Sequence, residues 1–215
     1  IAHELNQPLT AVANYGHSAQ TLLARGAAGA QVNEVIGRML AEARRAAEVV
    51  RRLRDLFRTG TTRLEIVNAH EIAAGVRRIG EQVIGTRAIA LEVTADPGTP
   101  PLYVDRLQIE LVLRNLIANS VDALAERTEP GARIEVSIRK QDEEHVRIVV
   151  SDNGPGVHPD AYHRLFQPFA SARPKGMGLG LAVSRAIAEA HGGSLQARGA
   201  GHGEFHLILP CAAKT

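Results

Sequence analysis

The stretch from Ser151 to Leu181 carries two glycine-rich patches, and it constrains the fold of this chain more than any other feature. The first patch, residues 153–156, follows the apolar run Val146–Val150, which predicts a buried strand ending at Asp152. The second patch, residues 176–180, opens an apolar, alanine-rich helix. Glycines ahead of a helix let backbone N–H groups approach an anion, and the first helical turn adds unpaired donors. The stretch therefore predicts a phosphate-binding clamp.

Asp152 lies where the predicted strand meets the first glycine patch. Its carboxylate can accept a hydrogen bond from an exocyclic amine such as that of adenine. Taken alone, the second patch is explained equally well as a plain junction between a loop and a helix. Its spacing differs from that of a P-loop, because Lys175 precedes the glycines. A nucleotide site therefore needs support from the rest of the chain.

The composition excludes several classes of protein. The 25 basic and 23 acidic residues leave a formal net charge of +2, which gives no basic patch for nucleic acid. No apolar run approaches the length of a membrane span and no signal peptide is found, so we expect this segment to make no membrane contact. The single Cys211 excludes an intrachain disulfide and fits a cytoplasmic location. The chain begins inside a predicted helix, so we expect a fragment of a longer parent, and a membrane anchor in that parent stays open.

Residues 1–25 are predicted to form an amphipathic helix. Its packing side carries Leu5, Leu9, Val12, Gly16, Ala19 and Leu23, and its opposite side carries His3, Gln7, Thr10, Asn14 and His17. We therefore expect His3 to face solvent, with Glu4 beside it and a bend at Pro8 one turn later. Most exposed histidines have no function, but these two neighbours favour one here.

A turn at Arg25–Ala30 is followed by a second predicted helix with apolar residues at alternating steps of four and three. That seam consists of Val32, Ile36, Met39, Ala43, Ala46, Val50, Leu53 and Phe57. Arginines and acidic residues alternate outside the seam, which indicates a solvated face rather than a binding surface. Two helices cannot bury both faces of such a hairpin in water, so we predict a homodimer that forms a four-helix bundle.

Residues 59–62 form the predicted boundary between a helical domain at 1–62 and a mixed domain at 63–215. The second domain is predicted to contain strands at Leu64–Val67, Ala88–Thr94, Leu102–Val104, Arg133–Arg139, Val146–Ser151, Ser194–Ala200 and Glu204–Leu209, and helices at Asn68–Ile84, Asp105–Arg127 and Leu179–His191. Asn68 and Glu71 form a capping box for the first of these helices. This order predicts an α/β sandwich with a mixed sheet and helices on one face.

The helix that starts at Asp105 separates apolar and polar residues onto different faces. Its apolar face carries Ile109, Leu113, Leu116 and Leu124, and its polar face carries Asn115, Asn119 and Asp122. Asparagine has a poor helix propensity, so its presence there needs a reason. A hydrogen bond to a neighbouring loop is one explanation. We favour a metal or phosphate site, because an amide oxygen suits Mg²⁺.

Five short motifs together resemble the sensor histidine kinases of two-component systems, over nearly the whole chain. They are His3-Glu4-Leu5-Asn6-Gln7-Pro8-Leu9 (phosphoacceptor box), residues 115–120 (asparagine box), residues 152–156 (first glycine box), Phe166 to Phe169 (phenylalanine box) and residues 176–180 (second glycine box). The HELNQPL form is similar to the branch that contains oxygen-sensing and dicarboxylate-sensing kinases. Ser120 departs from the alanine that is more usual in the family, and both residues are small.

The resemblance implies an ATP-binding domain of the gyrase, Hsp90 and histidine-kinase type. It implies transfer of the ATP γ-phosphoryl group to His3 and then to an aspartate of a response regulator. His3, Glu4 and Gln7 would be the catalytic residues, with Glu4 orienting His3 and Gln7 orienting a water that dephosphorylates the regulator. Asn119 would hold Mg²⁺, and Arg173 or Lys175 would reach the phosphates. The implied nucleotide-binding residues are Asn115, Asn119, Asp122, Asp152, Gly154, Gly156, Phe166, Phe169, Lys175, Gly176, Met177, Gly178, Leu179 and Gly180.

Two alternatives stay open at this point. A related ATPase of the gyrase and Hsp90 type would need a carboxylate near Asn115 to activate water, and Glu110 falls off that face. A dimerising scaffold would bind nucleotide and transfer nothing. The sequence names neither the signal nor the regulator, and it leaves open whether ATP reaches His3 of the same chain or of its partner.

Overall fold

A computed structural model describes residues 2–57, 63–125, 130–157, 164–168, 178–198 and 201–212, and the side chains at 2–6 and 48–57 lie outside that description. The chain divides into two compact units, Ile1–Thr61 and Thr62–Thr215. Among the described residues, no helix combines the length and the apolarity that crossing a bilayer requires.

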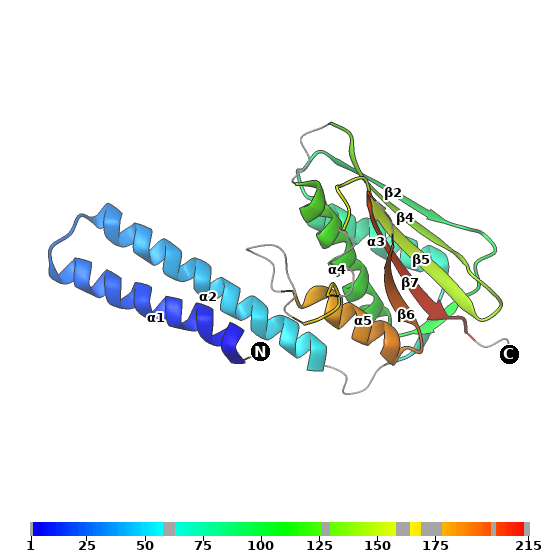
Figure 1. Ribbon diagram of the computed structural model, residues 1–215, viewed down its shortest axis with the longest axis horizontal. Helices are drawn as coiled ribbons and strands as arrows, with labels where there is room; N and C mark the ends of the chain where they lie inside the picture. The colour runs from blue at the N-terminus through cyan, green and yellow to red at the C-terminus, as the bar shows by residue number, and fades with distance from the viewer. Residues whose placement is uncertain are drawn as a thin grey trace. The chain divides into compact units, whose positions relative to one another are not determined.

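The first unit is the predicted helical hairpin (Figure 1), formed by α1 (Ala2–Ala24) and α2 (Gly29–Phe57). α2 begins inside the stretch predicted as a turn, so the turn is shorter than expected. Pro8 lies inside α1.

The side of α1 that packs within the single hairpin agrees only in part with the predicted one, because Val12, Gly16 and Ala19 are buried or half-buried as predicted and two leucines are not. Buried and half-buried residues follow the spacing Pro8, Val12, Tyr15, Ala19 and Leu22. Leu9 and Leu23, which were predicted in the seam, are 47% and 63% exposed. In α2, Val32 and Ala46 are buried as predicted, whereas Ala43 is exposed. The opposite side of α1 is exposed at Gln7, Thr10, Asn14 and His17, as predicted.

The second unit is an α/β sandwich with a mixed five-stranded sheet in the order β2-β4-β5-β7-β6. Its strands are β2 (Ile89–Ala95), β4 (Ala132–Lys140), β5 (His145–Asp152), β6 (Ser194–Arg198) and β7 (Gly203–Pro210). The β2–β4 pair is parallel and the other pairs are antiparallel. β1 (Glu65–Val67) and β3 (Leu102–Val104) form a separate antiparallel pair. The prediction of the fold class is confirmed for the hairpin and for the sandwich.

Three helices cover one face of the sheet (Figure 1): α3 (Ala69–Ile84), α4 (Arg106–Leu124) and α5 (Gly180–Ala190). The Asn68 backbone N–H donates to the Glu71 carboxylate at 2.9 Å, which confirms that half of the predicted capping box. Asp105 caps α4 by accepting the Gln108 N–H at 3.2 Å. α4 ends at Leu124, earlier than the predicted end.

The core lies between the helices and the sheet. Alternate residues of the strands point into it, and Val146, Ile148 and Val150 of the central strand β5 are fully buried. The apolar face of α4 is buried against them, as predicted, with Ile109, Leu113 and Leu116 almost without exposed surface.

Gly193 controls how closely the end of α5 approaches β7. A Cβ atom built on Gly193 would overlap the carbonyl oxygen of Ile208 on β7. We therefore expect Gly193→Ala to force a backbone shift and to lower the free energy of unfolding by about 1–3 kcal/mol. Gly98→Ala is the matched control, because nothing lies within 4 Å of its Cβ position. Urea unfolding followed by circular dichroism measures both changes, and equal stability of the two variants would contradict this packing.

Candidate nucleotide-binding site

The end of β5, the polar face of α4 and the start of α5 carry most of the predicted site residues that the structure describes. Asp152 is the last residue of β5, the central strand of the sheet. Asn115, Asn119 and Asp122 lie on α4, and Gly180 is the first residue of α5. All five belong to the second unit.

The Asp152 carboxylate is buried, with 6% of the residue exposed. Its Oδ1 atom accepts the Gly154 N–H at 3.0 Å, so the first glycine of the turn holds the carboxylate in place. Asn153 ties the same turn to β4, because its side chain accepts the Arg133 N–H at 2.9 Å and donates to the Gly131 carbonyl at 2.9 Å. A buried carboxylate in a fixed orientation can recognise an amine donor.

Glycines lie near this carboxylate at positions where a side chain would overlap neighbouring atoms. A Cβ atom on Gly154 would lie 2.7 Å from Asp152 Oδ1. Gly156 has a φ of +74° and packs against the backbone of His202, where a Cβ atom would lie 2.7 Å from the nitrogen. Both predicted glycines therefore allow close approaches of the backbone.

Gly203 is a site residue that the sequence did not reveal. It pairs with Asp152 across the β5–β7 ladder, and a Cβ atom on Gly203 would overlap the Asp152 carboxylate. The only signal in the sequence was the short run Gly201-His202-Gly203, which looks like an ordinary turn before a strand. Pairing between distant strands gives Gly203 its importance.

A cluster of His202, Glu204 and His206 lies beside Gly203 on β7. The Nε2 atoms of His202 and His206 lie 3.2 Å and 2.6 Å from the two carboxylate oxygens of Glu204. Burial opposes ionisation of Glu204, but hydrogen bonds from His206 and His202 outweigh it and keep the pKa of this carboxyl below its usual value. The ionised Glu204 carboxylate therefore links His202, which precedes Gly203, to His206 of β7.

Asn119 has an unpartnered buried atom. Its Nδ2 is buried and has no hydrogen-bond partner among the described residues. Such a donor suits a phosphate oxygen, and the oxygen of the same amide suits a hard cation. The described part of the chain holds no cluster of three or more His, Cys, Asp or Glu side chains that could bind a metal ion. The Asn119 amide by itself fits a single oxygen ligand to Mg²⁺, an ion that commonly takes its other ligands from water and phosphate.

Asn115 makes a contact between two helices that the sequence did not predict. Its Nδ2 donates to the Gly180 carbonyl at 3.3 Å and to Ser184 Oγ at 3.2 Å, so it joins α4 to the first turn of α5. Its other amide atom, Oδ1, lies beside the same glycine. Asp122 is exposed on α4.

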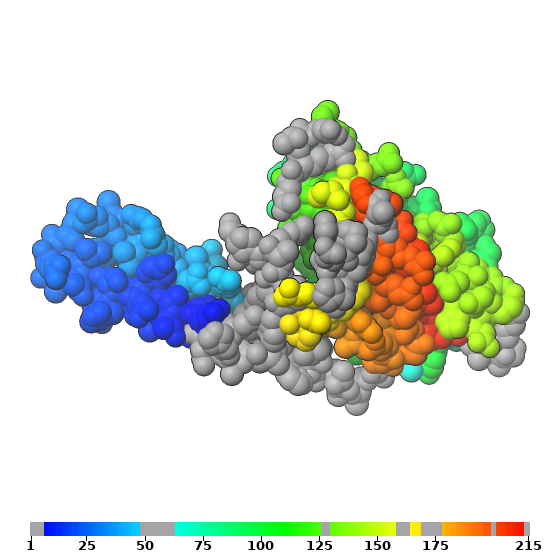
Figure 2. Space-filling model, in the orientation of Figure 1, coloured from blue at the N-terminus to red at the C-terminus, as the bar shows by residue number. Residues whose placement is uncertain are grey.

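The start of α5 has the geometry expected of an anion site. Gly178 has a φ of +63°, a backbone conformation that favours glycine, and Leu179 is buried. Among the described residues no side chain caps α5, and the first N–H groups of a helix have no partner within the helix and can bind an anion. Residues 164–168 lie beside α5 (Figure 2), where the Arg185 guanidinium stacks 5.6 Å from the centre of the Phe166 ring.

Several predicted residues cannot be placed. Phe169, Arg173, Lys175, Gly176 and Met177 lie outside the described residues. His3 and Glu4 lie on α1, but their side chains are outside the description. Gln7 is exposed on the same helix.

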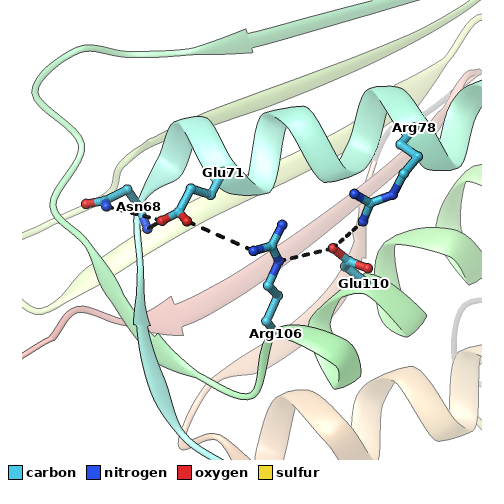
Figure 3. Close-up of polar contacts among 5 residues, drawn as sticks. All are labelled: Asn68, Glu71, Arg78, Arg106 and Glu110. Atoms are coloured by element: carbon cyan, nitrogen blue, oxygen red, sulfur yellow. Dashed lines mark hydrogen bonds and ion pairs between the residues drawn. The ribbon is translucent and has the colours of Figure 1, made fainter.

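Glu110 is held away from the role of a general base (Figure 3). It accepts from Arg78 at 2.8 Å and from Arg106 at 3.3 Å, in a network between α3 and α4. Arg106 also faces Glu71, whose pKa is lowered mainly by the hydrogen bond from the Asn68 backbone. Both hydrogen bonds hold the Glu110 carboxylate between α3 and α4, away from the face of α4 that carries Asn115, which argues against an ATPase that uses Glu110 to activate water.

Two protein-family models match this chain. Residues 104–213 match the family described as histidine kinase-, DNA gyrase B- and HSP90-like ATPase. Residues 1–62 match the His Kinase A (phospho-acceptor) domain. The described residues of the nucleotide site all fall within the first of these ranges.

Named relatives agree with these matches. Sensor protein FixL of Bradyrhizobium diazoefficiens is 32% identical over 99% of this chain and 42% of its own length. The C4-dicarboxylate transport sensor protein DctS of Rhodobacter capsulatus is 35% identical over 98% of this chain and 32% of its own length. The chain therefore spans less than half the length of these curated relatives.

The fold is also that of a solved histidine kinase. The crystal structure of histidine kinase ThkA in complex with response regulator protein TrrA matches with a TM-score of 0.75 at 21% identity, over 98% of this chain and 60% of that chain. Because one chain carries both the phosphoacceptor domain and the ATPase domain, this chain belongs to the sensor histidine kinases of two-component systems.

Proposed function

We propose that this chain transfers the γ-phosphoryl group of ATP to His3 and then to an aspartate of a response regulator. The observation that carries the proposal is the presence, in one chain, of a phosphoacceptor-domain match over residues 1–62 and an ATPase-domain match over residues 104–213. We further propose that residues 1–62 are the dimerisation and phosphotransfer domain and residues 63–215 the catalytic ATP-binding domain. This segment would work in the cytoplasm.

In the proposed site, Asp152 accepts a hydrogen bond from the adenine amine, and Gly154, Gly156 and Gly203 allow the close backbone approaches that shape this end of the sheet. The first turn of α5 binds the phosphates through its N–H groups. Asn119 holds Mg²⁺, which neutralises charge on the phosphates when bound. Asn115 fixes the start of α5 on α4. Phe166, Phe169 and Lys175 would cover the nucleotide.

His3 would be the nucleophile. Glu4 would accept a hydrogen bond from the Nδ1–H of the imidazole, which leaves the lone pair of Nε2 free to attack the γ-phosphorus, and it would take up the Nδ1 proton as the N–P bond forms. The new N–P bond forms as the bond between the γ-phosphorus and the bridging oxygen breaks, and ADP leaves with the electrons of that bond. In the second step a regulator aspartate oxygen attacks the same phosphorus and the N–P bond breaks, which regenerates His3. Gln7, one turn further on, would orient a water that dephosphorylates the regulator.

The proposal includes a homodimer. Leu9 and Leu23 lie two heptads apart on the same side of α1, and Leu40 of α2 is 50% exposed. Apolar side chains at this spacing are left uncovered by a single hairpin, and a second hairpin would bury them in a four-helix bundle. The response-regulator partner rests on membership of the family. The complex with a regulator is a property of ThkA, which shares the fold.

Labelling with γ-³²P-ATP tests the reaction. We expect acid-labile, alkali-stable label on the wild-type protein and none on His3→Gln, because the amide has no nucleophilic nitrogen. His17→Gln, an exposed histidine on the same helix, is the control and should be labelled normally. Free phosphate with unlabelled protein would indicate an ATPase instead, and ATP binding without either product would indicate a scaffold.

A second prediction concerns Asn119. Asn119→Asp removes the amide donor and adds a negative charge beside the phosphates, so we expect labelling to fall by at least about 100-fold. Size-exclusion chromatography should show the same oligomer as the wild type, because Asn119 lies in the second unit. Asn33→Asp, an exposed position on α2, should leave labelling intact. Normal labelling of Asn119→Asp would remove the assigned contact of the Asn119 amide with the phosphates, since an aspartate keeps an oxygen that can hold Mg²⁺.

The geometry around Asp152 gives a third prediction. Gly203→Ala should displace the Asp152 carboxylate, and we expect the Kd for ATP to rise about tenfold, the effect of losing about 1.4 kcal/mol of binding free energy. Isothermal titration at equal protein concentration measures this, with Gly98→Ala as the control. Unchanged affinity of Gly203→Ala would mean that Asp152 does not read the base in this orientation.

A further inference from the structure

α4 and α5 run in opposite directions, and hydrogen bonds join them at both ends of α5. Near the nucleotide site, Asn115 of α4 donates to the Gly180 carbonyl and to Ser184 of α5. At the other end, the Asp105 N–H that precedes α4 donates to Nε2 of His191, which follows α5, at 3.0 Å. The same two helices carry Asn119 and the glycine-opened N-terminus, and these polar contacts hold them together at the start and at the end of α5.

His191 uses both of its ring nitrogens. It is buried, with 6% of the residue exposed. Nδ1 lies 2.8 Å from the Ile187 carbonyl, which can only accept, so Nδ1 carries the proton. Nε2 accepts from the Asp105 backbone and therefore carries none. The contacts require the neutral imidazole with its proton on Nδ1, because a proton on Nε2 would face the Asp105 N–H.

Asp105 extends this connection to the point where the chain enters the second unit. Its Oδ1 accepts the Gln108 N–H at 3.2 Å and caps α4. Its Oδ2 accepts the Arg63 N–H at 3.0 Å. Arg63 is the first described residue after the linker, residues 58–62, which contains the predicted domain boundary. One unbroken series of hydrogen bonds therefore runs from the Arg63 backbone through Asp105 and His191 to α5.

The remaining buried residues of α5 are mostly small or apolar, namely Val183, Ser184, Ile187 and Ala188. Apolar packing is not directional and tolerates small sliding of one helix along another. Hydrogen bonds have a narrow range of distance and angle, so they fix the axial position. The position of the phosphate-binding end of α5 relative to Asn119 consequently depends on the polar contacts at Asn115 and His191.

We propose that His191 is a positioning residue for the nucleotide site. It fixes α5 on α4 through the Asp105 backbone, and Asp105 in turn connects this helix pair to the entry of the linker at Arg63. The inference rests on the nucleotide site proposed above. If the inference holds, the buried His191 at the end of α5 contributes to ATP affinity. The hydrogen bond between Arg63 and Asp105 would then connect the linker to the two helices that bind the nucleotide.

Two substitutions of His191 distinguish its hydrogen bond with Asp105 from its contact with Ile187 of α5. The amide of His191→Gln reaches the position of Nε2 and can still accept from Asp105, whereas that of His191→Asn reaches the position of Nδ1 and keeps only the contact with Ile187. We expect the Kd of the full chain for ATP to stay within about twofold for His191→Gln and to rise about tenfold for His191→Asn, the scale of one lost buried hydrogen bond. Equal affinities of the two variants, whether normal or reduced, would overturn the proposal.

A second pair tests the linker contact without touching His191. Arg63→Pro removes the N–H that donates to Asp105 Oδ2, and Arg63→Ala keeps that N–H while it removes the side chain. We expect the Kd for ATP to rise several-fold in Arg63→Pro and to match the wild type in Arg63→Ala. Equal ATP affinities of the two variants would refute the role of the hydrogen bond between Arg63 and Asp105. This test remains valid even if a His191 variant fails to fold.

The outcomes distinguish this inference from the proposed function. A wild-type chain that does not bind ATP would refute the nucleotide site itself. A wild-type chain that binds ATP while His191→Asn binds equally well would refute only the positioning role. Thermal melting by circular dichroism identifies variants that are folded at the titration temperature, and only those are compared.

Discussion

The structure of the second unit depends on the burial of α4. Val112, Leu113, Leu116 and Ile117 are at most 1% exposed, and α4 packs against α3, α5 and the sheet. Full burial of one such side chain stabilises a fold by about 1.5–3 kcal/mol, so this helix is held far more firmly than a surface helix. Asn115 and Asn119 project from the remaining face of the same helix. The amides on this helix are therefore positioned by the hydrophobic core.

The second constraint is the lack of room around Asp152. The carboxylate lies at the end of the central strand, and the approach of β7 at Gly203 and of the turn at Gly154 leaves no space for a Cβ atom. Burial of an acidic group costs free energy unless hydrogen bonds satisfy it. The Gly154 N–H satisfies one oxygen, which leaves the other lone pairs of the carboxylate for a ligand. The orientation of the Asp152 carboxylate thus depends on the absence of side chains at Gly154 and Gly203.

Periodicity and capping signals predicted most of the fold. The alternation in β4 and β5 and the caps at Asn68 and Asp105 are local properties, so the sequence carries them directly. The contacts of Gly203 with Asp152, of Asn115 with α5 and of His191 with Asp105 join residues from 51 to 86 positions apart. No local pattern encodes which distant strand or helix lies opposite. Asn115 was correctly placed on the polar face of its helix, and its actual partner could be found only from the fold.

The seam of α1 shows a different limit of sequence analysis. The apolar pattern that includes Leu9 and Leu23 predicts a buried stripe, yet the hairpin alone buries a stripe that is rotated toward Pro8, Tyr15 and Leu22. A helix in a four-helix bundle contacts two neighbours, so its apolar residues cover a wider arc than one partner can bury. Selection acts on the assembled protein, and the sequence therefore records every surface that is buried in that assembly. The mismatch between the predicted seam and the single hairpin is what a chain that associates through both helices would show.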